Sequence, residues 1–346
     1  MSAQSWLNRV WYVDSKPPAW LLPLEGIFGA AARFRRWLYT ADIRTATHLA
    51  CPVVVVGNLS VGGTGKTPLV CWLIERLREG GYRPGVVTRG HGGSNRAPRQ
   101  VQESDDAALV GDEPVLLARR TRAPIAVGRD RPAAAQILVD AGCDVIVSDD
   151  GLQHYALARD CEIVVVDAER GFGNGHLLPA GPLREGIQRL AAVDAIVMNG
   201  ATPGASAWAN TAGKPTLGMR LQALQAVSLL DSTARRLDEF TGQTVHAVAG
   251  IGHPQRFFNM LRAFGMVVSA HELPDHAAIQ PSDIAFDDGL PVLMTEKDAV
   301  KCAAFAKPQH WYVPVSAAFE AGEGDELFGI VRRRIGAGRS AQGNHG

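Results

Sequence analysis

One segment constrains the fold of this chain more than any other. Four consecutive valines, Val53 to Val56, lead into the glycine-rich loop 57–65, which is followed at once by Lys66 and Thr67. An apolar strand, a glycine-rich loop and a helix that opens with Lys-Thr form the context of a phosphate-binding loop. A glycine-rich turn that binds no nucleotide is the alternative interpretation.

The loop predicts a nucleotide site with defined roles. Its glycines let backbone N–H groups surround the phosphates, and the following helix start adds its positive dipole end. Lys66 is expected to reach the β- and γ-phosphates of ATP, and the Thr67 hydroxyl to bind Mg²⁺. Ser60 departs from the usual pattern, which has glycine there. The predicted nucleotide-binding residues are Ser60, Val61, Gly62, Gly63, Thr64, Gly65, Lys66 and Thr67.

A second apolar segment supplies acidic partners for this loop. Val145 to Ser148 are followed by Asp149 and Asp150, as in a strand whose terminal carboxylate helps to hold Mg²⁺. Adjacent side chains of a strand point to opposite faces, so the two aspartates can have separate roles. The sequence does not decide which of them binds the metal, and a solvated strand end is the alternative.

The body of the chain predicts an α/β fold. Short Val/Ile-rich runs with little alternation, typical of strands buried on both faces of a parallel sheet, are separated by helical stretches. We expect two α/β/α domains, the larger with a parallel sheet of the P-loop type, joined by a β-hairpin linker. The predicted divisions are 51–215 for the P-loop domain, 216–240 for the linker, 241–336 for the smaller domain and 337–346 for a disordered tail. The predicted strands of the larger domain are Val53–Val56, Gly85–Thr88, Ile125–Val127, Val145–Ser148, Ile163–Val166 and Ala195–Met198.

Residues 1–50 differ from the rest. Four of the seven tryptophans, Trp6, Trp11, Trp20 and Trp37, lie there beside a group of arginines. The apolar run between Ala19 and Ala32 is too short and too interrupted to span a bilayer. Aromatic residues with nearby arginines suit a membrane–water interface, so we expect a helical segment that contacts the membrane surface. Packing of these tryptophans on the protein core is the alternative.

Overall composition narrows the classes of partner. The 35 basic and 35 acidic residues balance, which argues against a nucleic-acid partner because such proteins carry a basic face. The five cysteines form no C-x-x-C pair, so neither a disulfide framework nor a zinc site is predicted.

Further motifs, taken together with the loop, resemble one family: the tetraacyldisaccharide 4′-kinases of lipid A biosynthesis in Gram-negative bacteria. The resemblance extends from the N-terminus to about Val315. It implies transfer of the ATP γ-phosphate to the 4′-hydroxyl of a tetraacylated glucosamine disaccharide 1-phosphate, at the cytoplasmic face of the inner membrane. The motifs are Thr88–Gly93, Gly111–Pro114, Val127–Arg131, Ser148–His154, Leu178–Arg184, Ala249–Gly252, Pro274–His276 and Thr295–Asp298.

The resemblance also implies roles for individual residues. Asp112 corresponds to a proposed catalytic base and His276 to its histidine partner, while Lys66 acts on the phosphates. Thr67, Asp149 and Asp150 correspond to the magnesium site, with Glu113 beside it. His91 departs from the family pattern, which often has an aromatic residue there. From the residues alone, Asp112 is equally suited to cap the helix that begins near Glu113.

Two other functions are weighed. A P-loop kinase of another glycolipid or sugar shares most of these motifs. A nucleotide-driven switch or metal-insertion protein is disfavoured, because the chain has no histidine-rich tract or cysteine pair for cargo. A base-reading segment of GTP-binding switches is also lacking, since Thr295–Asp298 has the residues in the wrong register.

Overall fold

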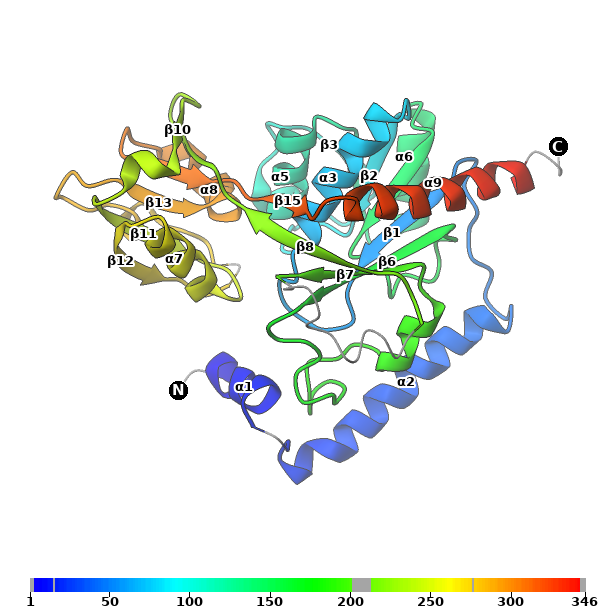
Figure 1. The fold of residues 1–346 in the computed structure, drawn as a ribbon. Helices are drawn as coiled ribbons and strands as arrows, with labels where there is room; N and C mark the ends of the chain where they lie inside the picture. The colour runs from blue at the N-terminus through cyan, green and yellow to red at the C-terminus, as the bar shows by residue number, and fades with distance from the viewer. Residues whose placement is uncertain (1–2, 15, 201–212, 276, 343–346) are drawn as a thin grey trace.

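Two β-sheets organise the chain (Figure 1). The computed structural model describes residues 3–14, 16–200, 213–275 and 277–342. The larger sheet has nine strands in the order β15-β8-β7-β6-β1-β5-β2-β4-β3, and the smaller has six in the order β10-β9-β14-β13-β11-β12. The predicted α/β class is confirmed.

The larger sheet has a parallel centre. Strand β1 pairs with β5 on one side and β6 on the other, both in parallel, so that Val54 lies between Val147 and Cys161. Only the edge strands β3 and β15 run antiparallel to their neighbours. The strands are β1 (Val53–Gly57), β2 (Pro84–Thr88), β3 (Arg99–Val101), β4 (Ile125–Val127), β5 (Val145–Asp149), β6 (Cys161–Asp167), β7 (Ala195–Asn199), β8 (Thr216–Gln222) and β15 (Ser316–Phe319).

Helices cover both faces of this sheet. Val54 and Val56 pack against α3 (Lys66–Glu79), α5 (Asp112–Thr121) and α9 (Glu323–Gln342) in one hydrophobic core. Val53 and Val55 face a second core with α6 (Arg131–Asp140). Burial on both faces explains why these strands lack alternating polar residues, and all six predicted strands of this sheet are present. The short helix α4 (Ala107–Val110) was not predicted.

The smaller sheet is mixed. Its strands are β9 (Gln225–Ser228), β10 (Ala234–Arg236), β11 (Thr244–Ala249), β12 (Val267–Glu272), β13 (Val292–Thr295) and β14 (His310–Val313). Strands β11 to β14 pair in parallel, whereas β9 joins β14 and β10 antiparallel. Helix α7 (Pro254–Ala263) packs Phe258 and Leu261 on this sheet, and α8 (Glu296–Cys302) follows β13.

The connection between the two sheets corrects the predicted linker. Within residues 216–240, all of which the structure describes, the hairpin consists of β9 and β10 alone, and it belongs to the smaller sheet. Strand β8 pairs in parallel with β7 in the larger sheet, because Leu217 and Met219 are buried in that core. The chain returns through β15, which pairs antiparallel with β8, so two strands rather than one hairpin link the sheets (Figure 1).

The C-terminal helix is a second correction. The predicted smaller domain extends to residue 336, but α9, which begins at Glu323, packs on the larger sheet (Figure 1). Leu327 and Val331 are fully buried in the core formed by β1 and β6, and this burial fixes the helix there. Helix α9 runs to Gln342, so the disorder predicted from residue 337 is wrong up to that residue. Residues 343–346 lie outside the described part of the chain.

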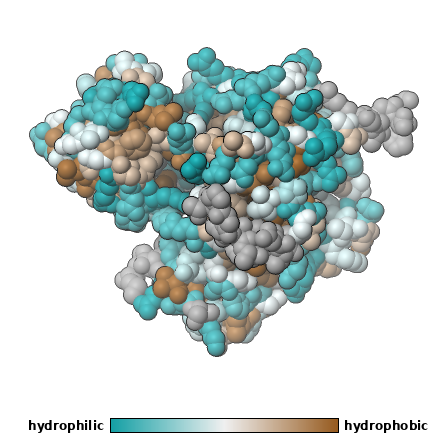
Figure 2. Space-filling model, viewed as in Figure 1, coloured by the Kyte–Doolittle hydropathy of each residue, from teal (hydrophilic) through white to brown (hydrophobic). Residues whose placement is uncertain are grey.

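The N-terminal segment begins with α1 (Ala3–Tyr12), followed by the short helix η1 (Ala19–Leu21) and the long helix α2 (Leu22–Thr40). Some of its tryptophans pack on the protein core, and others are exposed as expected for contact with a membrane surface. Trp11 is buried, and Trp6 packs against the same small core. Trp20 and Trp37 are 62% and 51% exposed. Hydrophobic atoms are visible over this segment in Figure 2. No helix in the described ranges is long and apolar enough to cross a membrane.

Candidate active site

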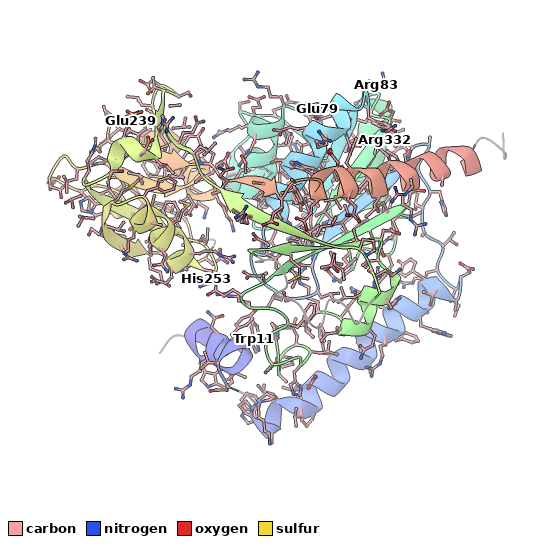
Figure 3. The ribbon with its side chains drawn as sticks, viewed as in Figure 1. Trp11, Glu79, Arg83, Glu239, His253 and Arg332 are labelled. Carbon is pink, nitrogen blue, oxygen red and sulfur yellow. The ribbon has the colours of Figure 1, made fainter. Side chains whose placement is uncertain are left out.

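A cleft of about 1310 Å³ lies between the two sheets and the N-terminal segment. Its wall includes the phosphate loop from Gly62 to Thr67 and the helix α2 residues Phe28 and Arg35. The smaller domain contributes His253, which faces the larger domain (Figure 3), and Arg256. The hollow is visible in the space-filling view (Figure 2).

The phosphate loop requires glycine at two of its positions. Gly62 and Gly65 have φ angles of 105° and 92°, in the region that favours glycine. A Cβ at Gly65 would also come within 2.5 Å of the Asn199 amide nitrogen, which donates to the Thr64 carbonyl at 3.0 Å. Asn199, at the end of β7, therefore holds this turn closed.

Ser60 is explained by its backbone. It does not have a positive φ, and it forms an isolated antiparallel bridge with Leu183. The next residue, Val61, donates its N–H to the Pro182 carbonyl at 2.9 Å. Position 60 is thus extended backbone, which serine adopts as readily as glycine.

Asp150 is engaged by two cations. Its carboxylate lies 3.5 Å from the Lys66 ammonium and 2.9 Å from the Arg184 guanidinium. Burial alone would raise the pKa of Asp150, but Lys66 and Arg184 outweigh it and hold the pKa well below its usual value. Asp150 is therefore ionised and fixes the position of Lys66 beside the loop.

Asp149 has the opposite environment. It is buried at the end of β5, and its Oδ1 has no hydrogen-bond partner in the described part of the chain. Burial first, and then the charge of Glu113, raise the pKa of Asp149 to about 7. The pKa values of the two adjacent aspartates therefore shift in opposite directions, because burial dominates around Asp149 and cations dominate around Asp150.

The acidic residues beside the phosphate loop can hold a divalent cation only together with ligands from outside the protein, such as phosphates and water. Among the described residues, no three His, Cys, Asp or Glu side chains are arranged to hold a metal ion. Mg²⁺ in nucleotide sites is commonly held by one or two carboxylates together with phosphates and water. The unpartnered Asp149 oxygen is suited to that arrangement, because a nearby cation would stabilise its charge.

Asp112 is the first residue of α5, not its cap. Gly111 occupies the N-cap position, so the capping alternative for Asp112 does not describe this helix. The Asp112 carboxylate lies 3.3 Å from the Lys301 ammonium of α8 in the smaller domain. Glu113, the next residue, lines the cleft. His276, the predicted partner of Asp112, lies outside the described residues.

Ion pairs connect the two domains on either side of the cleft. Arg120 of α5 donates to Glu296 of α8 at 2.8 Å. Arg256 of α7 pairs with Asp167, a buried carboxylate at the end of β6, at 2.9 Å. Of these four residues only Glu296 lies within a motif, because ion pairs between distant segments leave no local pattern in a sequence.

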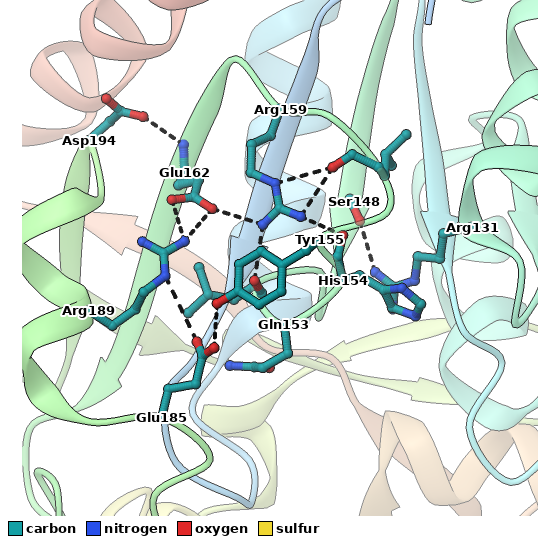
Figure 4. A network of polar contacts seen from close by, with 12 residues as sticks. Arg131, Ser148, Gln153, His154, Tyr155, Arg159, Glu162, Glu185, Arg189 and Asp194 are labelled. Atoms are coloured by element: carbon teal, nitrogen blue, oxygen red, sulfur yellow. Dashed lines mark hydrogen bonds and ion pairs between the residues drawn. The ribbon is translucent and has the colours of Figure 1, made fainter. Parts of the chain in front are cut away.

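A buried polar network supports the floor of the cleft (Figure 4). Glu162 of β6 accepts from Arg159 at 2.9 Å and from Arg189 at 2.5 Å. Arg189 also lies near Glu185, which accepts from the Tyr155 hydroxyl. Burial and the Glu185 carboxylate raise the pKa of Tyr155 to about 12, so the phenol remains a donor and keeps the ring at the cleft wall.

His154 lies between this network and the cleft. Burial, and then the positive charge of Arg131, lower its pKa to about 4, so the imidazole is neutral near pH 7. Arg131 is itself buried and donates to the Ser148 hydroxyl at 2.8 Å and to the Asp150 carbonyl. The arginine thus fixes the backbone that carries both aspartates.

Comparison with known proteins decides the family. The family model for tetraacyldisaccharide-1-P 4′-kinase matches residues 18–332. The chain belongs to the tetraacyldisaccharide 4′-kinase family. It is 48% identical over 332 residues to the tetraacyldisaccharide 4′-kinase of Nitrosococcus oceani, covering 95% of each chain. It is 50% identical over 320 residues to that of Aromatoleum aromaticum, covering 92% of this chain and 94% of the relative.

A solved structure agrees with this membership. The structure of Aquifex aeolicus LpxK, described as an "apo" form in complex with ATP, has a TM-score of 0.78 and 27% sequence identity. The match covers 91% of this chain and 98% of that one. The family predicted from the motifs is therefore confirmed, and the chain is a kinase.

The geometry adds residues to the predicted site. Arg184 and Arg131 belong to motifs of the family, but the motifs did not indicate that they hold Asp150 from two sides. Asn199 follows a Val/Ile-rich strand, and a polar residue at a strand end was its only signal. Lys301 had no signal in the sequence.

Proposed function

We propose that the chain transfers the γ-phosphate of ATP to the 4′-hydroxyl of tetraacyldisaccharide 1-phosphate, in lipid A biosynthesis at the cytoplasmic face of the bacterial inner membrane. The observation that carries the proposal is the composition of the cleft wall. It combines the phosphate loop with an apolar and cationic side of α2, including Phe28, Ala32 and Arg35. A lipid with an anionic sugar head group matches such a wall.

The phosphate loop binds the ATP phosphates in this proposal. Residues 60–65 offer backbone N–H groups, and Lys66 moves from Asp150 to the β- and γ-phosphates. Thr67, Asp149, Asp150 and Glu113 would hold Mg²⁺ together with the phosphates and water, with Asp149 as the direct ligand because its Oδ1 has no hydrogen-bond partner among the described residues. When bound, Mg²⁺ neutralises negative charge on the phosphates.

Asp112 accepts the proton of the sugar hydroxyl in this mechanism. A sugar hydroxyl is a weak nucleophile at neutral pH, so a positioned carboxylate assists the transfer. Lys301 orients the Asp112 carboxylate. Asp112 belongs to the larger domain and Lys301 to the smaller one, so the base is in place only when the two domains are in contact. In this proposal His276 is the histidine partner of Asp112.

Transfer of label tests the activity. The protein is incubated with γ-labelled ATP, Mg²⁺ and tetraacyldisaccharide 1-phosphate, and the lipid is extracted. We expect label in the lipid, and loss of the label with a substrate whose 4′-hydroxyl is methylated. Label found only in inorganic phosphate, or transferred equally to unrelated glycolipids, would contradict the proposed substrate.

The exposed side of α2 supports membrane binding. Leu24, Ile27, Phe34 and Trp37 are 46%, 68%, 59% and 51% exposed, and their spacing places them along one side of the helix. Arg33 and Arg35 are exposed near them, and basic residues add attraction to anionic lipid. This arrangement matches a helix lying in the membrane surface.

Vesicle sedimentation tests this part. The double variant Ile27→Ser/Phe34→Ser should bind vesicles of anionic phospholipid more weakly than the wild type. The control Val267→Ser/Leu230→Ser removes two other exposed apolar side chains, both in the smaller domain. Equal loss in the control would show that the effect is unspecific and would contradict the role of α2.

A further inference from the structure

The loop of residues 171–184, between β6 and the short helix η2 (Ile187–Ala192), contacts both the N-terminal helices and the phosphate loop. We call it the bridging loop. It contains the motif Leu178–Arg184, to whose residues the proposed reaction assigns no role. Figure 3 shows Trp11 between α1 and this loop.

On one side the bridging loop binds α1. The Asn174 N–H donates to the Trp11 carbonyl at 2.8 Å, and the Asn174 amide donates to the Val10 carbonyl at 3.0 Å. The Trp11 indole N–H donates to the Pro179 carbonyl at 3.0 Å. Val10 and Trp11 are buried, so these bonds are shielded from water.

The same loop binds α2. Glu25 accepts from the Leu177 N–H at 2.8 Å and contacts the His176 ring nitrogen at 2.9 Å. A Cβ at Gly29 of α2 would come within 2.8 Å of the Leu177 side chain, so the helix lies directly on the loop.

On its other side the bridging loop forms backbone bonds to the phosphate loop. Pro182 accepts from Val61 at 2.9 Å, and the Arg184 N–H donates to the Leu59 carbonyl at 2.7 Å. Ser60 lies between these two bonds, in its bridge with Leu183. The Arg184 side chain then reaches Asp150.

Asn174 links the two sides. Its amide also donates to the Ala180 carbonyl at 2.9 Å, and its Oδ1 accepts from the His176 N–H at 3.1 Å. Gly181 approaches it so closely that a Cβ there would collide with Oδ1. One side chain thus sets the distance between α1 and the backbone that holds the phosphate loop.

We infer that the bridging loop couples docking of the N-terminal helices to ATP binding, with Asn174 as the positioning residue. When α1 and α2 are seated, residues 182–184 hold positions 59–61 and Arg184 holds Asp150. Loss of the seating frees the phosphate loop and weakens ATP binding. A coupling free energy acts equally in both directions, so bound ATP must tighten the seating of the helices.

A direct contact between α1 and the phosphate loop also couples the N-terminal helices to the ATP site. The Tyr12 ring lies under the Arg170 guanidinium at 4.9 Å, and its hydroxyl is 3.5 Å from the Val61 carbonyl. Arg170 also reaches the Gly252 carbonyl of the smaller domain at 3.5 Å. Helix α1 therefore touches the phosphate loop as well as the bridging loop.

The variant Asn174→Asp tests the inference in the full chain. Aspartate keeps the shape and the acceptor for His176 but loses both donors. We expect the dissociation constant of a fluorescent ATP analogue, measured without lipid, to rise about fivefold or more. The exposed control Asn259→Asp on α7 adds the same charge and should leave it unchanged.

A purely structural role would lower the thermal midpoint but not the ATP affinity of the folded fraction, and that result would overturn the inference. If Asn174→Asp does not fold, Trp11→Phe decides the question. It keeps an aromatic ring in the small core but removes the indole bond to Pro179, and it should also weaken ATP binding. An unchanged affinity in Trp11→Phe would then overturn the inference.

The reverse direction is measured with anionic vesicles, and this arm rests on the proposed membrane binding. A non-hydrolysable ATP analogue should tighten vesicle binding of the wild type, and this gain should be smaller in Asn174→Asp. Vesicle binding that ignores the analogue would contradict the coupling. If the wild type binds no vesicles, the membrane proposal fails, while the lipid-free ATP titration still decides the inference.

Discussion

Replacement of Asp149 by asparagine is expected to stabilise the nucleotide-free protein while it abolishes phosphate transfer. Asp149 is 1% exposed, and its Oδ1 has no hydrogen-bond partner among the described residues. Burial and the charge of Glu113 raise its pKa from 3.8 to about 7. Above that pH the Asp149 carboxylate is charged in the folded protein, where it is buried, whereas in the unfolded chain the same charge is solvated by water.

The magnitude follows from the pKa. Because the folded-state pKa is raised, the stabilising contribution of the protonated carboxyl is complete below about pH 4 and is lost as the pH rises through about 7. Each pH unit in that interval corresponds to about 1.4 kcal/mol. The cost therefore reaches about 4 kcal/mol at pH 8, and asparagine avoids it.

Thermal unfolding between pH 4.5 and pH 8.5, with EDTA and without nucleotide, measures the effect. The melting temperature of Asp149→Asn should exceed that of the wild type by an amount that grows with pH. Asp150→Asn is the matched control and should lose stability, because Asp150 is paired with Lys66 and Arg184. A gap between Asp149→Asn and wild type that does not change with pH would refute the reasoning.

Three further predictions concern catalysis and domain contact. Lys66→Ala should lower kcat by roughly 10²–10³, as expected for loss of an electrostatic phosphate contact, and near wild-type kcat at saturating ATP would remove Lys66 from the site. Asp112→Asn should retain ATP binding but lose roughly 10²–10⁴ in turnover, whereas an equal loss confined to Glu113→Gln would make Glu113 the base. Arg256→Ala should reduce the free energy of unfolding by about 1–3 kcal/mol in denaturant titrations, because it leaves the buried Asp167 carboxylate without its partner, and no change would show that this pair contributes nothing.

The sequence predicted the elements whose physics is local. Val53 to Val56 and Val145 to Ser148 were predicted to be strands buried on both faces, and both are. The loop glycines were expected to let the backbone turn its N–H groups toward phosphates, and Gly62 and Gly65 have the positive φ angles that favour glycine. The family followed from motifs spread over the chain, and the comparisons confirm it.

Features that depend on distant residues were not predictable. Nothing in the stretch 216–240 shows that β8 belongs to one sheet and β9 to the other, since both strands mix apolar with polar residues. The predicted boundary of the smaller domain at residue 336 is wrong, because the apolar positions of α9, such as Leu327, would suit either core. Ser60 departs from the usual phosphate-loop pattern in the sequence, and only its bridge to Leu183 in the structure explains why serine is tolerated there. The catalytic roles of Asp112 and His276 stay predictions.

The return of the chain through β15 and α9 has a consequence for synthesis on the ribosome. The buried face of β1 and β6 is made early, but Leu327, Phe328 and Val331, which cover it, emerge last. Until then the nascent larger domain exposes an apolar surface and the unpaired edge of β8, both of which promote aggregation. The larger domain can therefore complete its fold only after the whole smaller domain has been translated.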